Sequence, residues 1–284
     1  MSSDIGGRGF APTASLVVAQ VRYQLISFWR TPIALFFTLV LPLMMLVLFN
    51  ALFGDEVVGT GSEAWPSSQF FTGGLAAFTA VSATYTNLAN LIPLRRDEGV
   101  LKRWRGTPLP TSLYLVGAVG AALVLAVVGV AIMLIVGVLA YDLEIEAAKV
   151  PAAVVTFVVG VCAFAALGMA VAAAVPTAQA AATVANATIL PLAFVSNVFI
   201  AVDDPPRWMD VLGDVFPLKP FVSSFQDAFN PFVDAPAFHW GRLAYVALWG
   251  VLGALVAARF FRWEPSRGGT PRRRRAVPAS TDAA

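Results

Sequence analysis

A stripe of uncharged polar side chains runs through an otherwise apolar segment at residues 69–93. Its members are Thr72, Thr79, Ser82, Thr86 and Asn90, which are separated by 7, 3, 4 and 4 residues. At about 100° per residue, these side chains fall within about 80° of one another on a helix. Hydroxyl and amide groups of this kind can form hydrogen bonds between packed helices, or they can line a polar path for a solute.

A second stripe of the same kind occupies residues 178–201. Its members, Gln179, Thr183, Asn186 and Asn197, fall within about 60° of one another on a helix. For both stripes, hydrogen bonding between helices and a polar path stay open as interpretations. Hydrogen bonds between helices would stabilise packing by about 0.6–2 kcal/mol per contact. Two matching stripes favour an arrangement in which these segments face each other or a partner subunit. The candidate path residues are Thr79, Ser82, Thr86, Asn90, Thr183, Asn186 and Asn197.

The chain lacks the residues that enzymes and ion-coupled carriers need. No ionisable residue lies inside the apolar segments, whereas proton-coupled carriers need carboxylates or histidines at membrane depth. The single histidine, His239, and the single cysteine, Cys162, cannot supply a metal cluster. Protease, hydrolase and P-loop motifs are missing. We expect no catalytic site, no metal site and no ATP bound by this chain, so uphill transport needs energy from another polypeptide.

The charged residues are few and unevenly placed. They make up 13% of the 284 residues, about half of the ~25% typical of a soluble domain. This composition excludes an ordinary cytosolic enzyme, a disordered protein and a nucleic-acid binder. Stretches without any charged residue are long enough for membrane-spanning helices. We predict an all-α membrane protein with six transmembrane helices, at about 32–53, 69–93, 110–140, 151–175, 178–201 and 240–261.

Basic residues are concentrated in alternate connections between these spans. One side holds 15 basic and 5 acidic residues, and the other side holds 4 basic and 12 acidic residues. Basic residues near span ends remain in the cytoplasm. We therefore expect a multi-pass protein of the cell membrane with both termini cytoplasmic, the loop 94–109 inside and the loop 202–239 outside.

Several segments outside the spans have patterns of their own. Residues 13–30 place Val17, Val18, Val21, Leu25, Phe28 and Trp29 on one helical face, with Gln20, Gln24 and Ser27 opposite. This pattern predicts an amphipathic helix in the inner interface, or else an extension of the first span. Residues 203–236 predict short amphipathic helices at the outer membrane face, with a solvated loop as the alternative. We expect a flexible lead at 1–12, one transmembrane domain at 13–264 and a disordered basic tail at 265–284 near anionic lipid.

The loop 91–110 reads LIPLRRDEGVLKRWRGTPLP. It resembles the cytoplasmic coupling segment of ABC-2 type transporter permeases, where arginine-glutamate-glycine-x-leucine-lysine-arginine precedes threonine-proline-leucine. Here Asp97 separates Arg96 from Glu98, a slight departure from that pattern. The segments Pro191–Asn197, Pro206–Trp208 and Phe216–Leu218 are also similar to these permeases, although Asn197 stands where many relatives carry glycine. The resemblance is to type V exporters, and most of all to the actinobacterial daunorubicin-resistance branch.

The resemblance implies that a short helix within 94–109 inserts into a groove on a cytoplasmic ATPase. The implied coupling residues are Arg95, Arg96, Glu98, Gly99, Leu101, Lys102, Arg103 and Trp104. Leu101 and Trp104 would be apolar knobs and the basic residues would face an acidic rim, while Glu98 would cap a helix or pair with a partner arginine. The alternative is that the arginines only enforce topology, which does not explain Glu98, Gly99 and Trp104 at family positions.

The family therefore implies a transport subunit rather than an enzyme. ATP and Mg²⁺ would be bound by separate ABC ATPases, and a second copy or a related permease would complete the membrane unit, surrounded by lipid and without nucleic acid. The cargo class is an amphipathic drug, lipid or glycan, as in antibiotic efflux, because the spans carry almost no charge. The competing readings are an ATP-independent channel or facilitator, and an intramembrane enzyme for which no catalytic constellation exists.

Overall fold

The computed structural model describes residues 13–54, 56–58, 64–107, 110–199 and 205–261. The predicted flexible lead at 1–12 and the predicted basic tail at 265–284 lie outside the described residues. The elements are α1 (Thr13–Trp29), α2 (Pro32–Leu35), η1 (Phe36–Val40), α3 (Leu41–Phe53), β1 (Val57–Val58), β2 (Trp65–Pro66), α4 (Ser67–Val81), η3 (Ser82–Thr86), α5 (Asn87–Asp97), α6 (Val100–Arg105), α7 (Thr111–Ala140), α8 (Val150–Ala174), α9 (Ala178–Val195), α10 (Arg207–Val215), α11 (Leu218–Gln226) and α12 (Trp240–Phe260).

The described chain is a bundle of helices, with one two-stranded antiparallel pairing of β1 and β2. Five helices are long and apolar enough to cross a membrane: Pro32–Phe53, Ser112–Ala140, Val150–Ala174, Ala178–Val195 and Trp240–Phe260. Long helices satisfy every backbone hydrogen bond internally, which is what a segment in hydrocarbon requires. The predicted all-helical membrane fold is confirmed.

The predicted span at 69–93 is helical but is not among those five apolar helices. It runs from α4 through the π-helical turn η3 into α5. All but one of the fifteen residues of α4 are buried in the bundle. A helix covered by its neighbours does not need an apolar surface, so its threonines, glycines and Gln69 lower its hydropathy without exposing polar groups to lipid. The count of six spans stays a prediction.

The helix predicted for 178–201 is shorter than expected. It ends at Val195, because Ser196 leaves helical geometry and Asn197 adopts a left-handed backbone with φ of 56°. Asn197 therefore does not continue the polar stripe of Gln179, Thr183 and Asn186, and its predicted place on that stripe is wrong.

Small residues let the helices approach closely. A Cβ on Gly168 of α8 would lie 2.6 Å from the carbonyl oxygen of Tyr85, so only glycine fits beside this π-helical turn. The Phe221 ring of α11 lies against Gly160, also in α8. Close approach increases van der Waals contact between the helices. This matters within a membrane, because the hydrophobic effect does not drive helices together there.

The helix α1 packs with Phe28 of its predicted apolar face, but also with Gln20 and Gln24 of the face predicted to be polar. Gln20, Gln24 and Phe28 are buried, and the Gln20 side chain fills the notch left by Gly117 of α7. Val18 and Trp29, which belong to the expected apolar face, are exposed. The glycine notch explains the difference, because it admits a long amide side chain between the two helices.

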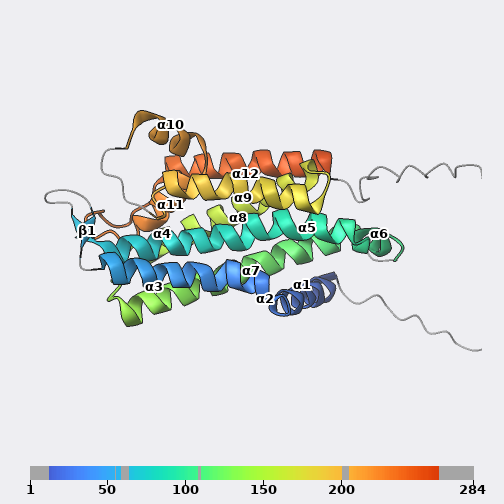
Figure 1. Ribbon diagram of the computed structural model, residues 1–284, viewed down its shortest axis with the longest axis horizontal. Coiled ribbons are helices and arrows are strands. Elements are labelled where there is room, and N and C mark those ends of the chain that lie inside the picture. Colours follow the sequence, from blue (N-terminus) through green and yellow to red (C-terminus); the bar gives the residue numbers. More distant parts are fainter. Residues whose placement is uncertain (1–12, 55, 59–63, 108–109, 200–204, 262–284) are drawn as a thin grey trace, which may run out of the picture.

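The two ends of the bundle differ in character. Figure 1 shows α1 and α6 toward one end, where α12 also finishes, and β1, α10 and α11 toward the other. The short helices predicted within 203–236 are present as α10 and α11. The apolar residues of α10, such as Trp208 and Val211, are exposed, as a membrane-surface helix requires. The apolar residues Leu218, Val222 and Phe225 of α11 are instead buried in the main core, so α11 is a core helix and not a surface helix.

Candidate functional site

The predicted coupling segment forms a sharp elbow between α5 and α6. Gly99 has a left-handed backbone with φ of 71°, and its amide donates to the carbonyl of Arg96. Nothing lies within 4 Å of the position a Cβ on Gly99 would take. Glycine is used here for its backbone freedom, since it ends α5 and allows α6 to begin at once.

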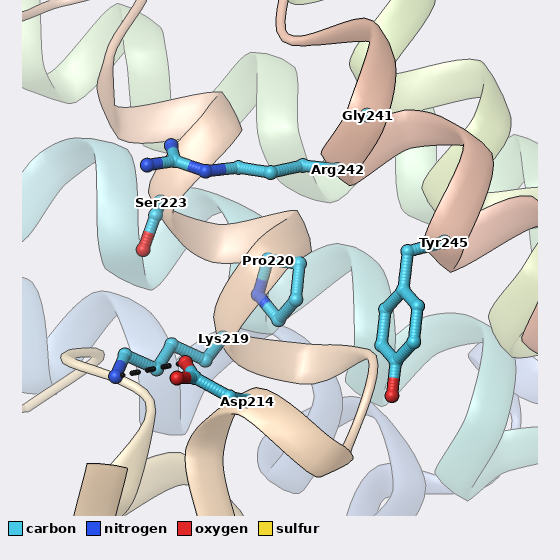
Figure 2. A pocket seen from close by; sticks show the side chains of 7 residues that line it. All are labelled: Asp214, Lys219, Pro220, Ser223, Gly241, Arg242 and Tyr245. Carbon is cyan, nitrogen blue, oxygen red and sulfur yellow. Dashed lines mark ion pairs between the residues drawn. The ribbon is translucent and has the colours of Figure 1, made fainter. Parts of the chain in front are cut away.

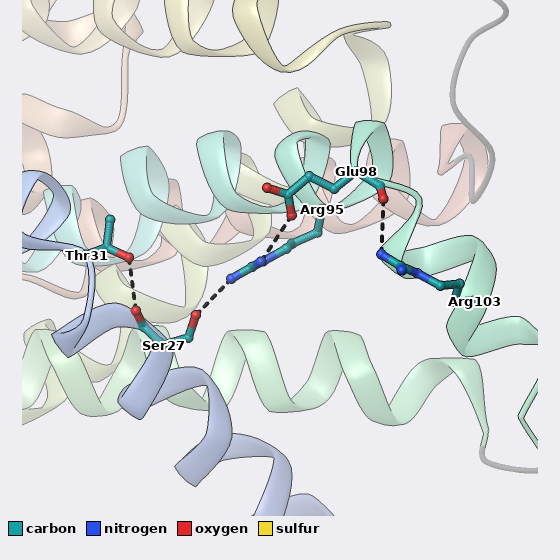
Figure 3. A network of polar contacts seen from close by, with 5 residues as sticks. All are labelled: Ser27, Thr31, Arg95, Glu98 and Arg103. Carbon is teal, nitrogen blue, oxygen red and sulfur yellow. Dashed lines mark hydrogen bonds and ion pairs between the residues drawn. The ribbon is translucent and has the colours of Figure 1, made fainter.

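Hydrogen bonds hold the elbow in shape and tie it to α1 (Figure 3). Arg95 Nη1 lies 3.1 Å from Glu98 Oε2, and Arg95 Nη2 donates to Ser27 Oγ of α1 at 2.8 Å. Arg103 Nη2 donates to the backbone carbonyl of Glu98 at 3.3 Å. The resemblance predicts that Glu98 caps a helix or pairs with an arginine of a partner. In the structure, Glu98 forms an ion pair with Arg95 of its own chain.

The next two residues of α5 bind the turn between α8 and α9. Arg96 is buried and donates to the carbonyls of Ala172 at 3.2 Å and Val175 at 2.6 Å. Asp97 Oδ2 accepts from the amide of Ala178 at 2.7 Å. The prediction that Arg96 faces an acidic rim on a partner is wrong, because its guanidinium is used inside the chain.

The two expected apolar knobs also point inward. Leu101 is completely buried in a cluster with Leu88 of α5 and Met169 of α8. Trp104 is half-buried, with its ring centroid 5.7 Å from that of Tyr114 and its Nε1 donating to the carbonyl of Pro110. The prediction of direct apolar contact with a partner is therefore corrected for both residues, because α6 needs them to dock onto its own bundle.

The charged side chains of the elbow remain exposed. Lys102 and Arg103 are exposed on α6, and the Glu98 side chain is 44% exposed beside them. With the apolar side of α6 turned inward, the face that a partner can contact is polar and basic. Of the predicted coupling residues, these three are available for a partner, and Arg95, Gly99, Leu101 and Trp104 shape the element that presents them.

The polar stripe of 69–93 lies inside the bundle. Thr79 packs its methyl group against Gly129 of α7 and donates its hydroxyl to the carbonyl of Leu75. Asn90 donates to the carbonyl of Thr86 in its own helix. Ser82 and Thr86 are the first and last residues of the π-helical turn η3, whose widened geometry often marks functional positions.

The stripe of α9 points away from the described bundle. Thr183 and Asn186 are exposed, and the Thr183 hydroxyl donates to its own helix at Gln179. The two stripes therefore do not meet within one chain. Within the bundle, a side-chain hydrogen bond of 2.7 Å between Tyr85 Oη and Thr188 Oγ1 joins η3 to α9. Sequence reasoning missed this pair, because Tyr85 falls off the stripe that the smaller polar residues define.

A comparison with models of known protein families assigns the chain to a family. The family model described as ABC-2 type transporter matches residues 15–230, well over half of the chain. The chain belongs to the ABC-2 type transporter family. The protein is thus a multi-pass membrane permease of an ABC transporter, and permeases of this family work with ABC ATPase partners. Comparison with curated proteins finds no match, so the daunorubicin-resistance branch stays a prediction.

At the end opposite α6, the permease has a pocket of about 290 Å³ between α10, α11 and α12 (Figure 2). The ammonium of Lys219 bridges Asp210 at 2.9 Å and Asp214 at 3.1 Å. Burial lowers the pKa of Lys219, but its hydrogen bonds to both carboxylates outweigh burial and leave that pKa raised. Tyr245 donates to the carbonyl of Val215, which holds α10 against α12.

A second ionic group joins the same helices of the permease. Asp227 Oδ2 lies 2.8 Å from Arg242 Nη1 and 2.8 Å from His239 Nε2. Burial raises the pKa of Asp227, and the charges of Arg242 and His239 oppose this shift only in part. His239 therefore helps to join the end of α11 to the start of α12.

Proposed function

We propose that this permease is the membrane-spanning subunit of an exporter driven by separate ABC ATPases. ATP and Mg²⁺ bind to those ATPases, and the permease moves an amphipathic drug, lipid or glycan outward. The observation that carries the proposal is the α5–α6 elbow, whose exposed surface offers Lys102, Arg103 and Glu98 to a partner while its other side chains contact the transmembrane helices. If a partner ATPase displaces the elbow, its contacts with the transmembrane helices must change as well.

The distribution of charge supports a cytoplasmic location for the elbow. The side assigned to the cytoplasm carries 15 of the 19 basic residues, and basic residues near span ends remain inside. Figure 1 places α1, α6 and the end of α12 together, as this topology requires. The elbow then faces the cytoplasm of the cell, where ATP is available, and the pocket near Lys219 faces outward.

The substrate path is proposed to lie between two permease copies, or between this chain and a related permease. Thr183 and Asn186 are exposed on α9, a helix apolar enough to cross a membrane. An amide facing lipid, as on Asn186, would lose hydrogen bonds to water, whereas the Thr183 hydroxyl keeps its hydrogen bond to the Gln179 carbonyl. A second permease covering this face would remove that cost and form a polar seam. The described spans carry few charges, which suits an amphipathic cargo.

The first test is capture of an ABC ATPase from the same cells by the purified permease. The double variant Lys102→Glu and Arg103→Glu is expected to reduce co-purification of the ATPase roughly tenfold, because reversed charges oppose a partner surface that matches the native ones. Arg207→Glu is the matched control, since it makes the same type of charge reversal on an exposed residue at the other end. The mass of the purified complex reports the number of permease copies.

Equal capture by the wild type and the double variant would contradict the assignment of the elbow as the docking surface. If the wild type captures no ATPase and carries solute without ATP, the hypothesis of an ATP-independent channel or facilitator replaces that of an exporter. Efflux of candidate amphipathic compounds from cells then identifies the substrate.

A further inference from the structure

Two adjacent residues of α5 hold the ends of two other helices. The guanidinium of Arg96 donates to the carbonyls of Ala172 and Val175, where α8 ends. The carboxylate of Asp97 accepts from the amide of Ala178, where α9 begins. The pair therefore spans the short turn of residues 175–177 and contacts both of the helices that it joins.

The signs of the two charges match the two helix ends. The last carbonyls of α8 have no partner within their own helix and carry partial negative charge, while the first amides of α9 carry partial positive charge. A cation at the first end and an anion at the second end are the favourable arrangement. Exchanging the order of the two residues in sequence would place each charge at the wrong helix end.

Burial makes these contacts persistent. Arg96 is 3% exposed, and its charge is held by backbone carbonyls within the bundle. Moving α5 away from α8 would leave both the guanidinium and the carbonyls without these hydrogen bonds in a site that water reaches poorly. Thr177 caps α9 independently, since its Oγ1 accepts from the amide of Ala180, so the helix end does not need Asp97 in order to form.

The helix α8 connects this turn to the rest of the bundle. Gly168 of α8 lies against the backbone of Tyr85 in η3, and Ala163 of α8 lies against Gly250 of α12. A displacement at the end of α8 is therefore shared with α12 as well as with α9. In contrast, Arg95 connects the same end of α5 to Ser27 of α1.

We propose that Arg96 and Asp97 form a clamp that makes the α8–α9 turn move together with the α5–α6 elbow. The clamp rests on the proposed function, since it transmits to α8 and α9 the displacement that a partner ATPase applies to α6. Arg96 and Asp97 are positioning residues in this scheme, and neither contacts the substrate.

The clamp is tested by measuring a distance between α5 and α9 in the intact complex. Spin labels are attached at Leu94→Cys and Gln179→Cys, both exposed positions, in a Cys162→Ala background because Cys162 is an exposed free thiol. Electron paramagnetic resonance then records the distance distribution without nucleotide and with a non-hydrolysable ATP analogue. The wild type is expected to give one narrow distribution that does not change with nucleotide.

Removing the clamp is expected to separate the two helices. With Asp97→Ala or Arg96→Gln, the distribution broadens, shifts on addition of the analogue, and transport per ATP hydrolysed falls roughly tenfold while the ATPase remains bound. Asp97→Asn retains a carbonyl acceptor and should restore part of the coupling. Glu146→Gln is the control, because it removes an exposed acid from an ion pair with Lys149 at the far end of α8.

The outcomes distinguish this inference from the proposed function. A wild-type distance that changes with nucleotide, or an unchanged distribution and coupling in Asp97→Ala, would overturn the clamp. Failure of the wild-type permease to bind the ATPase would overturn the proposed function, while the comparison without nucleotide would still show whether Asp97 holds α9 to α5. A merely structural role would lower thermal stability without changing the ratio of transport to ATP hydrolysis.

Discussion

Three consecutive residues at the end of α5 contact three different elements. Arg95 donates to α1, Arg96 donates to the end of α8, and Asp97 accepts from the start of α9. Arg95 and Arg96 carry the same positive charge as Lys102 and Arg103, yet only Lys102 and Arg103 are exposed. The difference is one of position on the helix, because side chains 100° apart reach different neighbours.

Leu101 provides a test at the residue scale. It is completely buried between α5, α7 and α8, so Leu101→Ala leaves a cavity and is expected to destabilise the docked α6 by about 2–5 kcal/mol. The measurement is thermal unfolding of the purified permease, followed by the fluorescence of its tryptophans. Leu94→Ala is the control, since Leu94 is 45% exposed and should change the melting temperature little. Equal melting of both variants would show that Leu101 is not an anchor.

At the scale of elements, the elbow combines a helix end, a left-handed glycine and a short helix. α5 ends at Asp97, Gly99 reverses the chain, and α6 returns its apolar side to the bundle. The result is a short helix with one buried face and one basic face. A partner that pushes on this helix acts on the transmembrane helices through packed contacts and not through a flexible loop.

Gly99 provides a test at this scale. Substitution by alanine is expected to cost about 1–2 kcal/mol, because the left-handed backbone is unfavourable for residues with a Cβ. The surrounding space is open, so the cost is conformational and not steric. Gly99→Asn should therefore be tolerated better than Gly99→Ala, and Gly99→Val should be worst, in both thermal stability and ATPase capture.

The control for this series is Gly241→Ala. Gly241 also has nothing within 4 Å of its Cβ position, but it lies in the ordinary first turn of α12. This variant should behave as the wild type. A series in which Gly99→Asn is the most damaging variant would contradict the backbone explanation.

At the scale of the whole molecule, the elbow and the pocket lie at opposite ends of the bundle. Figure 1 shows α1 and α6 toward one end, and it shows α10 and α11, which line the pocket together with α12, toward the other. The helices between them are joined by glycine contacts and by few polar bonds. An ATPase at one end can therefore influence the opposite end only through displacement of whole helices.

The sidedness of this arrangement is tested with single cysteines in the Cys162→Ala background. Thr107→Cys, next to the elbow, is expected to react with a membrane-impermeant maleimide only after cells are permeabilised. Glu144→Cys, between α7 and α8, should react in intact cells, because the acidic loops are assigned to the outer side. The reverse pattern of labelling would invert the topology and remove the elbow from the reach of a cytoplasmic ATPase.

The sequence alone determined the helical membrane class, and its resemblance to ABC-2 permeases predicted a short helix within 94–109. Membrane helices require long apolar stretches, and these can be read without knowing any contact. The elbow is also determined by residues close together in the sequence, because Gly99 and its neighbours carry the motif that resembles the family. The helix predicted for 178–201 ends at Val195, earlier than expected. The hydropathy pattern does not reveal this end, because it depends on the backbone conformation of Ser196 and Asn197.

Only the tertiary structure decided which side chains face inward. The basic residues of the elbow are chemically alike, yet Arg96 is buried against α8 and Arg103 is exposed. Thr72 and Thr79 of the α4 stripe are covered by α7, while the stripe of α9 faces outward, although the two stripes have similar spacing in the sequence. Periodicity identifies a helical face, but the neighbour that covers this face depends on how distant helices pack, because burial results from contacts between residues far apart in the chain.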